Sequence, residues 1–336
     1  MSQIRTAIIG YGVAGSVFHA PLVHSDPSYA LRAIVTNDPG RAADAAARYG
    51  RDILVPDVDA LFERRSELDL VVVASPNHTH APLARRAFDA GLDVVVDKPF
   101  ALTVSESREL LEQASSAGCR LTVFQNRRWD GDFQTVAEAV RAGRRGEIHQ
   151  FESAFEWWSP HRARSWRDTT PIGRGGGILF DLAPHLVDQA LLLFGPVERV
   201  HAELDFRRSG AVNDDDSLLT LTHANGVRSR LWMSVVDPAP RPRFRVVGSS
   251  AALVIHGLDP QERQLSAGLL PSSPGYGMRE DDALITGPGI QSHIPIQRGD
   301  YPAFYREFAS GRTPVDPAES IAALELIEQA VRQAVV

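Results

Sequence analysis

The sequence predicts two domains of different class, an α/β domain followed by an α+β domain. Over residues 1–124 short apolar strands alternate with helices, which is typical of a doubly wound parallel sheet. Over residues 125–336 several strand-like segments follow one another without helices between them, which indicates an open, mainly antiparallel sheet with helices on one face. The length of 336 residues and an apolar share of 43% allow two ordinary hydrophobic cores.

A glycine-rich turn follows the first strand directly. Residues 4–9 read as a buried parallel strand, and Gly10-Tyr11-Gly12-Val13-Ala14-Gly15 leads from it into a short helix at about 15–20. In this pattern the first glycine permits a tight turn, the second lets a pyrophosphate approach the backbone, and the third allows close helix packing. The glycines alone also fit a simple tight turn, but in this context they predict a Rossmann dinucleotide-binding domain.

The second strand, residues 31–35, ends where such a domain binds the adenosine ribose. Asn37 occupies the position in which an acid normally takes the ribose hydroxyls of NAD, and Asp38 comes one residue later. Arg41 could pair with the 2′-phosphate of NADP. We therefore expect NADP or NAD as cofactor, and these residues slightly favour NADP.

The remaining elements of the first domain continue the alternation. We expect helices at 39–49, 80–90 and 103–118, and strands at 53–55, 68–74, 92–96 and 121–124, the last closing the sheet. Open α/β sheets bind ligands at the carboxyl ends of their strands, where Ser75-Pro76-Asn77-His78-Thr79-His80 and Asp97-Lys98-Pro99 lie. Either histidine could instead cap the next helix. The lysine is a candidate for chemistry, because desolvation or nearby cations lower the pKa of an ammonium group, or else a surface residue before a turn.

An acid, an imidazole and a second acid stand on one face of an expected helix in the second domain. Asp181 and His185 are four residues apart and Asp188 follows three later. A carboxylate that fixes the tautomer of a histidine is a common way to build a general base near neutral pH. The preceding glycines 175–177 leave room for a ligand or another backbone. The alternative is a surface helix with a solvated acid/histidine pair.

The rest of the second domain reads mostly as strands. We expect a helix at 132–143, an aromatic-rich strand at 147–157, strands near 197–207, 215–223, 226–236, 242–248 and 251–256, and final helices at 300–310 and 317–335. Residues 258–300 are rich in Pro and Gly and are expected to form a long excursion over the surface, as a lid, an interface or a disordered segment. The run Asp214-Asp215-Asp216 is expected to be a solvated turn rather than the site of a hydrolase.

Composition limits the possible partners and the compartment. The formal net charge of −7 argues against binding to nucleic acid or to anionic membranes, so we expect small molecules or further copies of the chain. The single Cys119 cannot form an intrachain disulfide and is expected to pack rather than react. No signal peptide is recognisable and no apolar run is expected to approach a membrane span, so the cytoplasm is the expected location.

Taken together, these pieces resemble the Gfo/Idh/MocA family of nicotinamide-dependent sugar and polyol dehydrogenases. The matching motifs are Gly10 to Gly15, Pro76-Asn77 with His80, Lys98-Pro99, and Gly177 through Asp181 to His185. A narrower likeness to the branch of NADP-dependent scyllo-inositol dehydrogenases rests on Gly15-Ser16-Val17-Phe18-His19, Asn126-Arg127-Arg128-Trp129-Asp130, Trp166-Arg167, residues 181–195, Gly248, and Gln261-Glu262 with Gly268. The chain departs from the family pattern at Asp97, where Glu is usual, and at Ala183, where Gly is usual.

The resemblance implies hydride transfer between NAD(P) and a secondary alcohol of a cyclitol, sugar or related polyol. It implies a catalytic set of Lys98, Asp181 and His185, with Pro99 in the cis form. The implied cofactor-binding residues are Gly10, Gly12, Val13, Ala14, Gly15, Asn37, Arg41, Ser75, Pro76, Asn77, His80, Asp97, Lys98, Pro99 and Asn126. The implied substrate-binding residues are Lys98, Arg128, Trp129, Trp158, Trp166, Arg167, Asp181 and His185. No metal is expected.

Two other functions stay open at this point. The chain could be a binding protein that senses the nicotinamide cofactor without turnover, although such a protein has no need of all three catalytic residues. It could also be a closed-cycle sugar oxidoreductase that holds its cofactor tightly. An open antiparallel sheet has a second face to cover, so we expect a homo-oligomer, a dimer or a tetramer.

Overall fold

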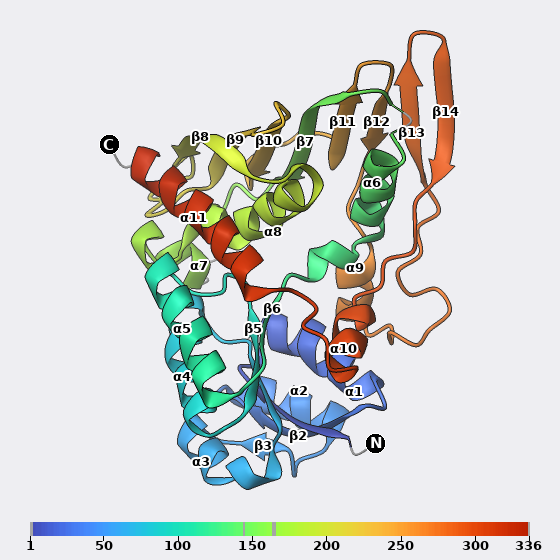
Figure 1. Ribbon diagram of the computed structural model, residues 1–336. Helices are drawn as coiled ribbons and strands as arrows, with labels where there is room; N and C mark the ends of the chain where they lie inside the picture. Colours follow the sequence, from blue (N-terminus) through green and yellow to red (C-terminus); the bar gives the residue numbers. More distant parts are fainter. Residues whose placement is uncertain (1–2, 144, 163–165, 335–336) are drawn as a thin grey trace. The chain divides into compact units, whose positions relative to one another are not determined.

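The structure is a computed structural model that describes residues 3–143, 145–162 and 166–334 (Figure 1). The contacts of the chain divide it into two compact units. The first unit comprises Met1–Asn126, Gln261–Tyr276 and Asp300–Ile321, and the second comprises Arg127–Pro260, Gly277–Gly299 and Ala322–Val336. The sequence assigned all of 125–336 to one domain, whereas the contacts place two later segments with the first unit. Aromatic packing explains part of this, because Tyr301 lies 6.0 Å from Phe18 between ring centroids.

The sheet of the first unit is parallel and six-stranded, in the order β3-β2-β1-β4-β5-β6. Its strands are β1 Ile4–Ile9, β2 Tyr29–Val35, β3 Leu54–Val55, β4 Leu70–Val73, β5 Asp93–Asp97 and β6 Leu121–Phe124. Its helices are α1 Ala20–Ser25, α2 Pro39–Tyr49, α3 Val58–Glu63, α4 His80–Asp89, α5 Val104–Ala117, α9 Gln261–Ser266 and α10 Pro302–Ala309, with short helices η1 Ala14–His19, η2 Arg65–Glu67 and η3 Asn77–Thr79. The predicted doubly wound sheet is confirmed. The strand order reverses at β1, which is where such sheets bind ligands.

Both faces of this sheet are buried at its centre, so β4 and the middle of β5 are continuous runs of apolar residues. Val71 and Val94 belong to a core that includes α4 and α5, while their neighbours Val72 and Val95 are equally buried on the opposite face. Cys119 packs against the first of these cores, and burial raises the pKa of its thiol.

The helix predicted at about 15–20 is longer and less regular than expected. It begins as the π-helical segment η1 and continues as α1 to Ser25. Pro21 explains the irregularity, because it lacks the amide hydrogen that an α-helix would use at this point.

The sheet of the second unit is eight-stranded, in the order β14-β13-β12-β11-β7-β10-β9-β8. Its strands are β7 Ile148–Glu156, β8 Val197–Asp205, β9 Asp216–His223, β10 Arg228–Ser234, β11 Phe244–Gly248, β12 Ala252–Ile255, β13 Asp282–Gly287 and β14 Ile290–Pro295. The prediction of a mainly antiparallel sheet is confirmed. The exception is β7 with β10, which run parallel because the intervening chain crosses over through α8.

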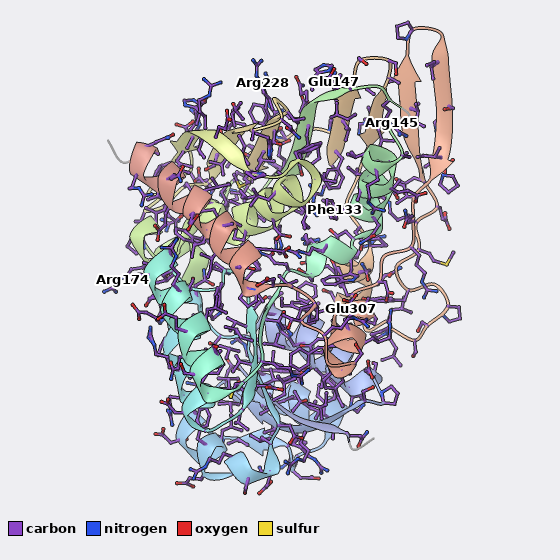
Figure 2. All side chains as sticks on the ribbon, in the orientation of Figure 1. Phe133, Arg145, Glu147, Arg174, Arg228 and Glu307 are labelled. Carbon is purple, nitrogen blue, oxygen red and sulfur yellow. The ribbon has the colours of Figure 1, made fainter. Side chains whose placement is uncertain are left out.

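Helices α6 Gly131–Arg141 and α8 Gly177–Phe194 pack on this sheet. The second unit also contains α7 Trp166–Thr169, the short helix η5 Ile172–Arg174, and most of η4 Asn126–Trp129 and α11 Pro317–Ala334. Helix α8 contacts β7, β9 and β10 (Figure 1). Phe133, which is labelled in Figure 2, lies near the start of α6. Its ring packs on that of Phe244 in β11, with ring centroids 6.3 Å apart.

Helix α8 corrects the expectation that no apolar run approaches a membrane span. It is 18 residues long with a mean hydropathy of 1.4, which is enough to cross a membrane by length and composition. It is also 78% buried inside the fold. A core helix of a globular unit meets the same criteria, and the burial and the sheet contacts of α8 identify it as such a helix.

The prediction of a long excursion at 258–300 is wrong for much of that segment. It contains α9 and a hairpin, β13 and β14, that extends the sheet beyond β12. Leu253 of β12 lies opposite Ile285, and the hairpin turns at Gly289, which has a φ of +70°. The Pro- and Gly-rich composition concealed two strands that pair with each other, of which β13 also pairs with β12.

Candidate functional site

The glycine-rich turn joins β1 to η1, and its glycines have different roles. A Cβ on Gly15 would lie 2.1 Å from the carbonyl oxygen of Gly10, and a Cβ on Gly10 would lie 2.5 Å from that of Ala74. Neither position has room for a side chain. Gly12 differs, because the nearest atom to its Cβ position is an Arg41 guanidinium nitrogen at 3.9 Å. The turn is therefore closely packed at both ends and open in its middle, where the pyrophosphate of a dinucleotide would approach.

The residues after Gly12 present the open side of this turn. Val13 is 54% exposed and Ala14 is half-buried at the start of η1. Backbone amides at an exposed helix start beside a glycine turn can donate hydrogen bonds to a phosphate group.

The end of β2 is organised around α2. The carboxylate of Asp38 accepts a hydrogen bond from the backbone amide of Arg41 at 2.9 Å and so caps α2. Asn37 and the Arg41 side chain are both exposed. The acid of this segment therefore serves the helix, while the Arg41 guanidinium lies beside Gly12.

Lys98 follows β5 at the carboxyl edge of the sheet. The Lys98–Pro99 peptide bond is cis, as the family resemblance predicted. The Asp97 carboxylate accepts a hydrogen bond from the backbone amide of Lys98 at 2.9 Å, and Lys98 itself is half-buried.

The sequence holds a signal for Lys98 that the motif analysis missed. Among the 35 Lys and Arg residues of the chain, Lys98 is the single lysine. An arginine side chain stays charged at all accessible pH values, whereas a lysine can give up and regain a proton. Because arginine occupies every other Lys or Arg position of the chain, Lys98 is a candidate for chemistry that needs an ammonium group.

His80 connects the ends of β4 and β5. Its ring is 1% exposed, with Nδ1 2.8 Å from the carbonyl oxygen of Pro99 and Nε2 2.9 Å from that of Ser75. Burial lowers the pKa of His80, and the nearby Asp97 carboxylate partly opposes that shift. The structure thus brings together the predicted residues of two neighbouring strand ends, with His80 acting on backbone groups.

Other residues of this edge differ in exposure. Ser75 is half-buried and its hydroxyl lies 2.5 Å from that of Thr79. Asn77 is 7% exposed and Asn126 is 5% exposed, while Pro76 is open to solvent.

The start of α8 is held by Asp214, which corrects the expectation of a solvated acidic turn. Asp214 and Asp215 are both fully buried. The Asp214 carboxylate accepts hydrogen bonds from the Leu179 amide and the Ser217 hydroxyl, each at 2.8 Å, so it caps α8 from a distant loop. Burial raises the pKa of Asp214 to about 6. Composition could not reveal this cap, because the partner amides lie 35 positions away in the chain.

The space for this cap depends on glycine. Gly177 has a φ of +87°, and a Cβ there would lie 1.9 Å from the Asp214 carboxylate. The glycines before α8 thus accommodate a close approach of protein, which was one of the two expected uses.

The catalytic candidates of α8 lie on its middle turns. Asp181 is half-buried, His185 is 5% exposed, and the His185 ring lies 6.4 Å from that of Phe155 in an edge-on arrangement. The guanidinium groups of Arg127 and Arg243 lie over the Phe155 ring, 4.8 and 3.9 Å from its centroid. Buried aromatic and cationic groups therefore surround the segment of α8 that carries the imidazole.

Asp188, the second acid on this face, is paired. Arg128 donates two hydrogen bonds to its carboxylate, from Nε at 2.8 Å and from Nη2 at 2.5 Å, and both side chains are largely buried. This bidentate pair fixes η4 to α8. It also means that Arg128, a predicted substrate-binding residue, already has a structural partner.

The aromatic substrate-binding candidates are less uniform. Trp129 is half-buried in η4, whereas Trp158 is 57% exposed and its backbone pairs with Val236. Trp166 and Arg167 lie in α7, but their side chains are outside the described part of the chain. Lys98 belongs to the first unit, and Asp181 and His185 belong to the second.

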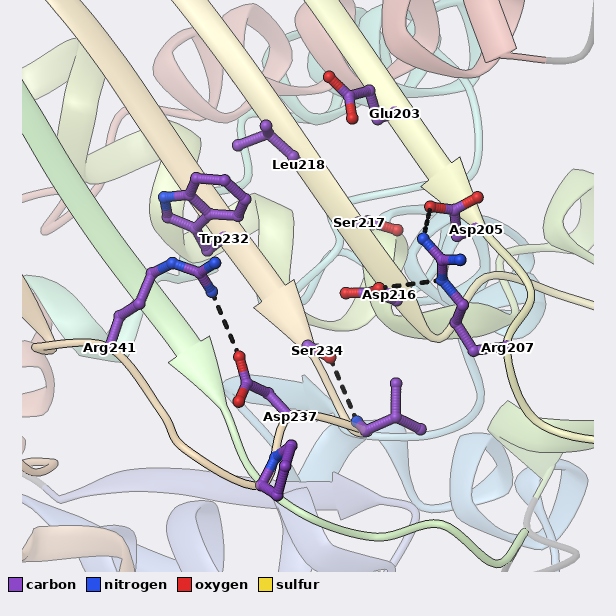
Figure 3. Close-up of a pocket in the computed structure, with 12 residues that line it drawn as sticks. Glu203, Asp205, Arg207, Asp216, Ser217, Leu218, Trp232, Ser234, Asp237 and Arg241 are labelled. Atoms are coloured by element: carbon purple, nitrogen blue, oxygen red, sulfur yellow. Dashed lines mark hydrogen bonds and ion pairs between the residues drawn. The ribbon is translucent and has the colours of Figure 1, made fainter.

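A separate polar pocket of about 360 Å³ lies on the outer face of the second sheet (Figure 3). In it, Arg241 lies over the Trp232 ring at 3.9 Å, and Arg207 pairs with Asp216 at 3.2 Å. Trp232 alternates along β10 with the buried Leu231 and Met233, so this face is opposite to the one that packs on α8.

Across the described residues, no three His, Cys, Asp or Glu side chains gather as a metal site would require.

Comparisons with known proteins agree with this architecture. A model described as the oxidoreductase family with an NAD-binding Rossmann fold matches residues 4–125, and one for the GFO/IDH/MocA C-terminal domain matches residues 133–254. The uncharacterized oxidoreductase YdgJ of Escherichia coli (strain K12) is 38% identical over 342 residues, which cover 99% of this chain and 96% of YdgJ. The chain belongs to the Gfo/Idh/MocA oxidoreductase family. It is therefore an oxidoreductase with a nucleotide-binding first unit.

Other Gfo/Idh/MocA relatives match over nearly the whole length. The scyllo-inositol 2-dehydrogenase (NADP(+)) IolW of Bacillus subtilis (strain 168) is 29% identical over 347 residues, covering 98% of this chain and 94% of IolW. The solved structure of YPO2259 from Yersinia pestis superposes with a TM-score of 0.90 at 36% identity, covering 98% of this chain and 95% of YPO2259. This likeness to an inositol dehydrogenase agrees with the resemblance found in the motifs.

Proposed function

We propose that this oxidoreductase oxidises a secondary alcohol of a cyclitol, sugar or related polyol and passes the hydride to NADP or NAD. The observation that carries the proposal is that the chain's single lysine, Lys98, stands at the carboxyl end of β5, on the ligand-binding edge of a nucleotide-binding sheet. The names of several relatives support the substrate class. They include IolW, an inositol 2-dehydrogenase, a D-apiose dehydrogenase and a levoglucosan dehydrogenase.

In this proposal three side chains divide the work. A bound nicotinamide would supply the hydride acceptor, and the side chains of the chain would act on the substrate hydroxyl. His185 accepts the proton of the substrate hydroxyl. The carbon that bears this hydroxyl gives up its hydride and becomes a carbonyl carbon. Lys98 donates a hydrogen bond to the reacting oxygen and stabilises the negative charge that develops there, and Asp181 orients His185 and binds a neighbouring hydroxyl.

NADP is the cofactor that the end of β2 favours. The Asp38 carboxylate caps α2 and Asn37 is neutral, so neither offers the free acid that normally binds the ribose hydroxyls of NAD. The exposed Arg41 guanidinium lies beside Gly12, where it would pair with a 2′-phosphate.

Polar and aromatic groups of the second unit would hold the substrate hydroxyls. The proposed contacts are Arg128, Trp129, Trp158, Trp166 and Arg167, together with Asp181 and His185. Arg128 is fixed by Asp188, which would present its remaining donors in one orientation.

We further propose that the chain works in the cytoplasm as a homo-oligomer. The outer face of β8, β9 and β10 supports this, because the half-buried Trp232 and Leu218 line its polar pocket (Figure 3). Residues 1–124 would bind the cofactor and residues within 125–336 the substrate. No nucleic acid or membrane partner is proposed.

The test is a turnover assay with matched lysine variants. The purified protein is incubated with NAD or NADP and a panel of inositols, aldoses and sugar acids, and the reduced nicotinamide is followed by absorbance. We expect turnover with at least one polyol and a lower KM for NADP than for NAD. Lys98→Met, Lys98→Arg and His185→Ala should bind the cofactor normally and lose turnover by roughly 100-fold or more.

The arginine variant is the sharpest of these controls. It keeps a cation at position 98 and makes the protein free of lysine, so full activity in Lys98→Arg would reject a role that needs an ammonium group. Near-normal turnover in both Lys98→Met and His185→Ala would reject the proposed mechanism. If the wild-type protein binds the cofactor without reducing it, a protein that senses the cofactor without turnover is favoured instead. If nicotinamide cofactor copurifies tightly with the protein, a closed-cycle sugar oxidoreductase is favoured.

A further inference from the structure

His19 is a buried histidine for which the proposed mechanism has no use. It ends η1, directly behind the glycine-rich turn, and its side chain is fully shielded from solvent. Its ring lies 4.3 Å from the Phe124 ring between centroids. A buried polar ring of this kind needs partners for both nitrogens, because an unpaired buried polar atom costs stability.

One nitrogen of this ring is hydrogen-bonded and the other is not. Nδ1 lies 2.6 Å from the hydroxyl of Tyr305, which α10 brings back to the first unit. Nε2 makes no hydrogen bond among the described residues, and it lies 4.0 Å from the Asp97 carboxylate. The imidazole therefore stands between a phenol and a carboxylate.

Chemistry assigns the protons of this arrangement. Burial raises the pKa of the Tyr305 phenol and lowers the pKa of His19 to about 4, so both groups are neutral near pH 7. The Asp97 carboxylate, 4.0 Å from Nε2, favours a proton on that nitrogen, which makes Nδ1 the acceptor of the hydrogen bond that the Tyr305 hydroxyl donates. The single ring proton of His19 is thereby placed on Nε2, facing Asp97.

Asp97 links this arrangement to Lys98. Its carboxylate accepts a hydrogen bond from the backbone amide of Lys98 at 2.9 Å. The groups that face it electrostatically are His19, His80 and Tyr305, of which His80 also lies close to Lys98. A change in the orientation of Asp97 would therefore reach the backbone of the chain's single lysine.

We propose that His19 and Tyr305 are positioning residues of the oxidoreductase. Tyr305 fixes the tautomer of His19, the Nε2 proton of His19 attracts the Asp97 carboxylate electrostatically across 4.0 Å, and this carboxylate accepts a hydrogen bond from the backbone amide of Lys98. The inference rests on the proposed function of Lys98. It assigns a role to His19, the last residue of the Gly15-Ser16-Val17-Phe18-His19 motif, and to Tyr305 of α10, which the proposed mechanism does not use.

Two tyrosine variants separate positioning from stability. Tyr305→Phe removes the hydroxyl that bonds to His19. Tyr29→Phe is the matched control, because its buried hydroxyl donates to the Tyr305 carbonyl at 2.7 Å and does not contact His19. We expect Tyr305→Phe to lower kcat about tenfold and to move the pH profile of kcat, while Tyr29→Phe stays within about twofold of wild type at equal cofactor affinity.

Two histidine variants test the proton on Nε2. A glutamine amide can place an N–H near the position of Nε2, whereas the shorter asparagine amide reaches only the position of Nδ1. His19→Gln should therefore retain most of the turnover, and His19→Asn should lose about tenfold. Equal activity of these two variants, or a Tyr305→Phe enzyme with wild-type kcat and pH profile, would overturn the inference.

A readout without turnover keeps the inference separate from the proposed function. Protein labelled with ¹³C-lysine gives one lysine side-chain signal, from Lys98. That signal should move in Tyr305→Phe and stay in place in Tyr29→Phe. If wild type turns over no polyol, the proposed function fails, while a moved signal still supports positioning and an unmoved signal rejects it.

Discussion

The glycine-rich turn of the first unit and helix α8 of the second are held in place by different means. The turn depends on backbone contacts within a short stretch, where Gly10 and Gly15 pack so closely that neither tolerates a Cβ. Helix α8 depends on side chains from distant parts of the chain. Asp214 caps its start, Arg128 pairs with Asp188, and Arg243 donates to Gln189.

The contrast shows how two candidate sites of one chain differ in what they require to be held in place. A turn defined by sterics needs particular residues at particular positions, so it is visible as a motif. A helix fixed by remote polar partners needs only that the fold bring those partners together, and the three contacts of α8 span 35, 60 and 54 positions. Substitutions should therefore affect the two sites in different ways.

The largest effect should come from the glycine turn. Gly15→Ala places a Cβ 2.1 Å from a backbone oxygen, so the turn must open, and we expect cofactor affinity to fall by about 100-fold or more together with a lower Tm. Gly12→Ala is the matched control, because its Cβ would meet nothing closer than the Arg41 guanidinium at 3.9 Å. It should keep the wild-type Tm and weaken only the cofactor, as measured by calorimetry and nicotinamide fluorescence. A normal Tm and normal affinity in Gly15→Ala would contradict the steric account.

A smaller effect should come from the ion pair that holds α8. Asp188→Ala leaves the Arg128 guanidinium buried without its carboxylate, and we expect the free energy of unfolding to fall by about 3 kcal/mol. Arg245→Ala is the control within the same unit, since its pair with Glu152 is much more exposed and should contribute about 0 to 1 kcal/mol. Urea unfolding measures both. Equal losses would mean that burial does not distinguish the two pairs.

The smallest effect should be a pH dependence of opposite sign in the two units. The pKa of His19 is lowered to about 4, so the unfolded chain binds its proton more readily and stability rises with pH between about 4 and 6.5. The pKa of Asp214 is raised to about 6, so the folded state binds its proton more readily and stability falls as pH rises between about 3.8 and 6.

Variants isolate the two slopes. Removing either group should change the difference in unfolding free energy between pH 4 and pH 7 by on the order of 2 kcal/mol, in opposite directions for His19→Gln and Asp214→Asn. Urea midpoints across this range provide the measurement. Slopes of the same sign in the two variants would contradict the assignment of the buried charges.

Much of the fold could be predicted because its strands and helices follow local rules. The apolar strands Leu70–Val73 and Leu121–Phe124 lie within the predicted ranges or at their limits, as does the capped helix Pro39–Tyr49. The structure of segment 258–300 could not be predicted in this way. Its strands β13 and β14 are stabilised by pairing with β12 and with each other, and their composition does not indicate strands. The same reason applies to the parallel pairing of β7 with β10, which depends on the crossover through α8.

The candidate site divides in the same way. The sequence by itself determined the family, the glycine turn, Lys98 and the spacing of Asp181 and His185, because each is a short pattern whose chemistry can be read from neighbouring residues. Only the tertiary structure decided that Asp214 is a buried helix cap, that Asp188 belongs to Arg128, and that His19 faces Asp97. These three depend on burial and on partners far along the chain. Sequence spacing encodes neither the burial of a residue nor its distant partners. The free-energy cost of burying a charge is set by the groups that the folded chain places beside it.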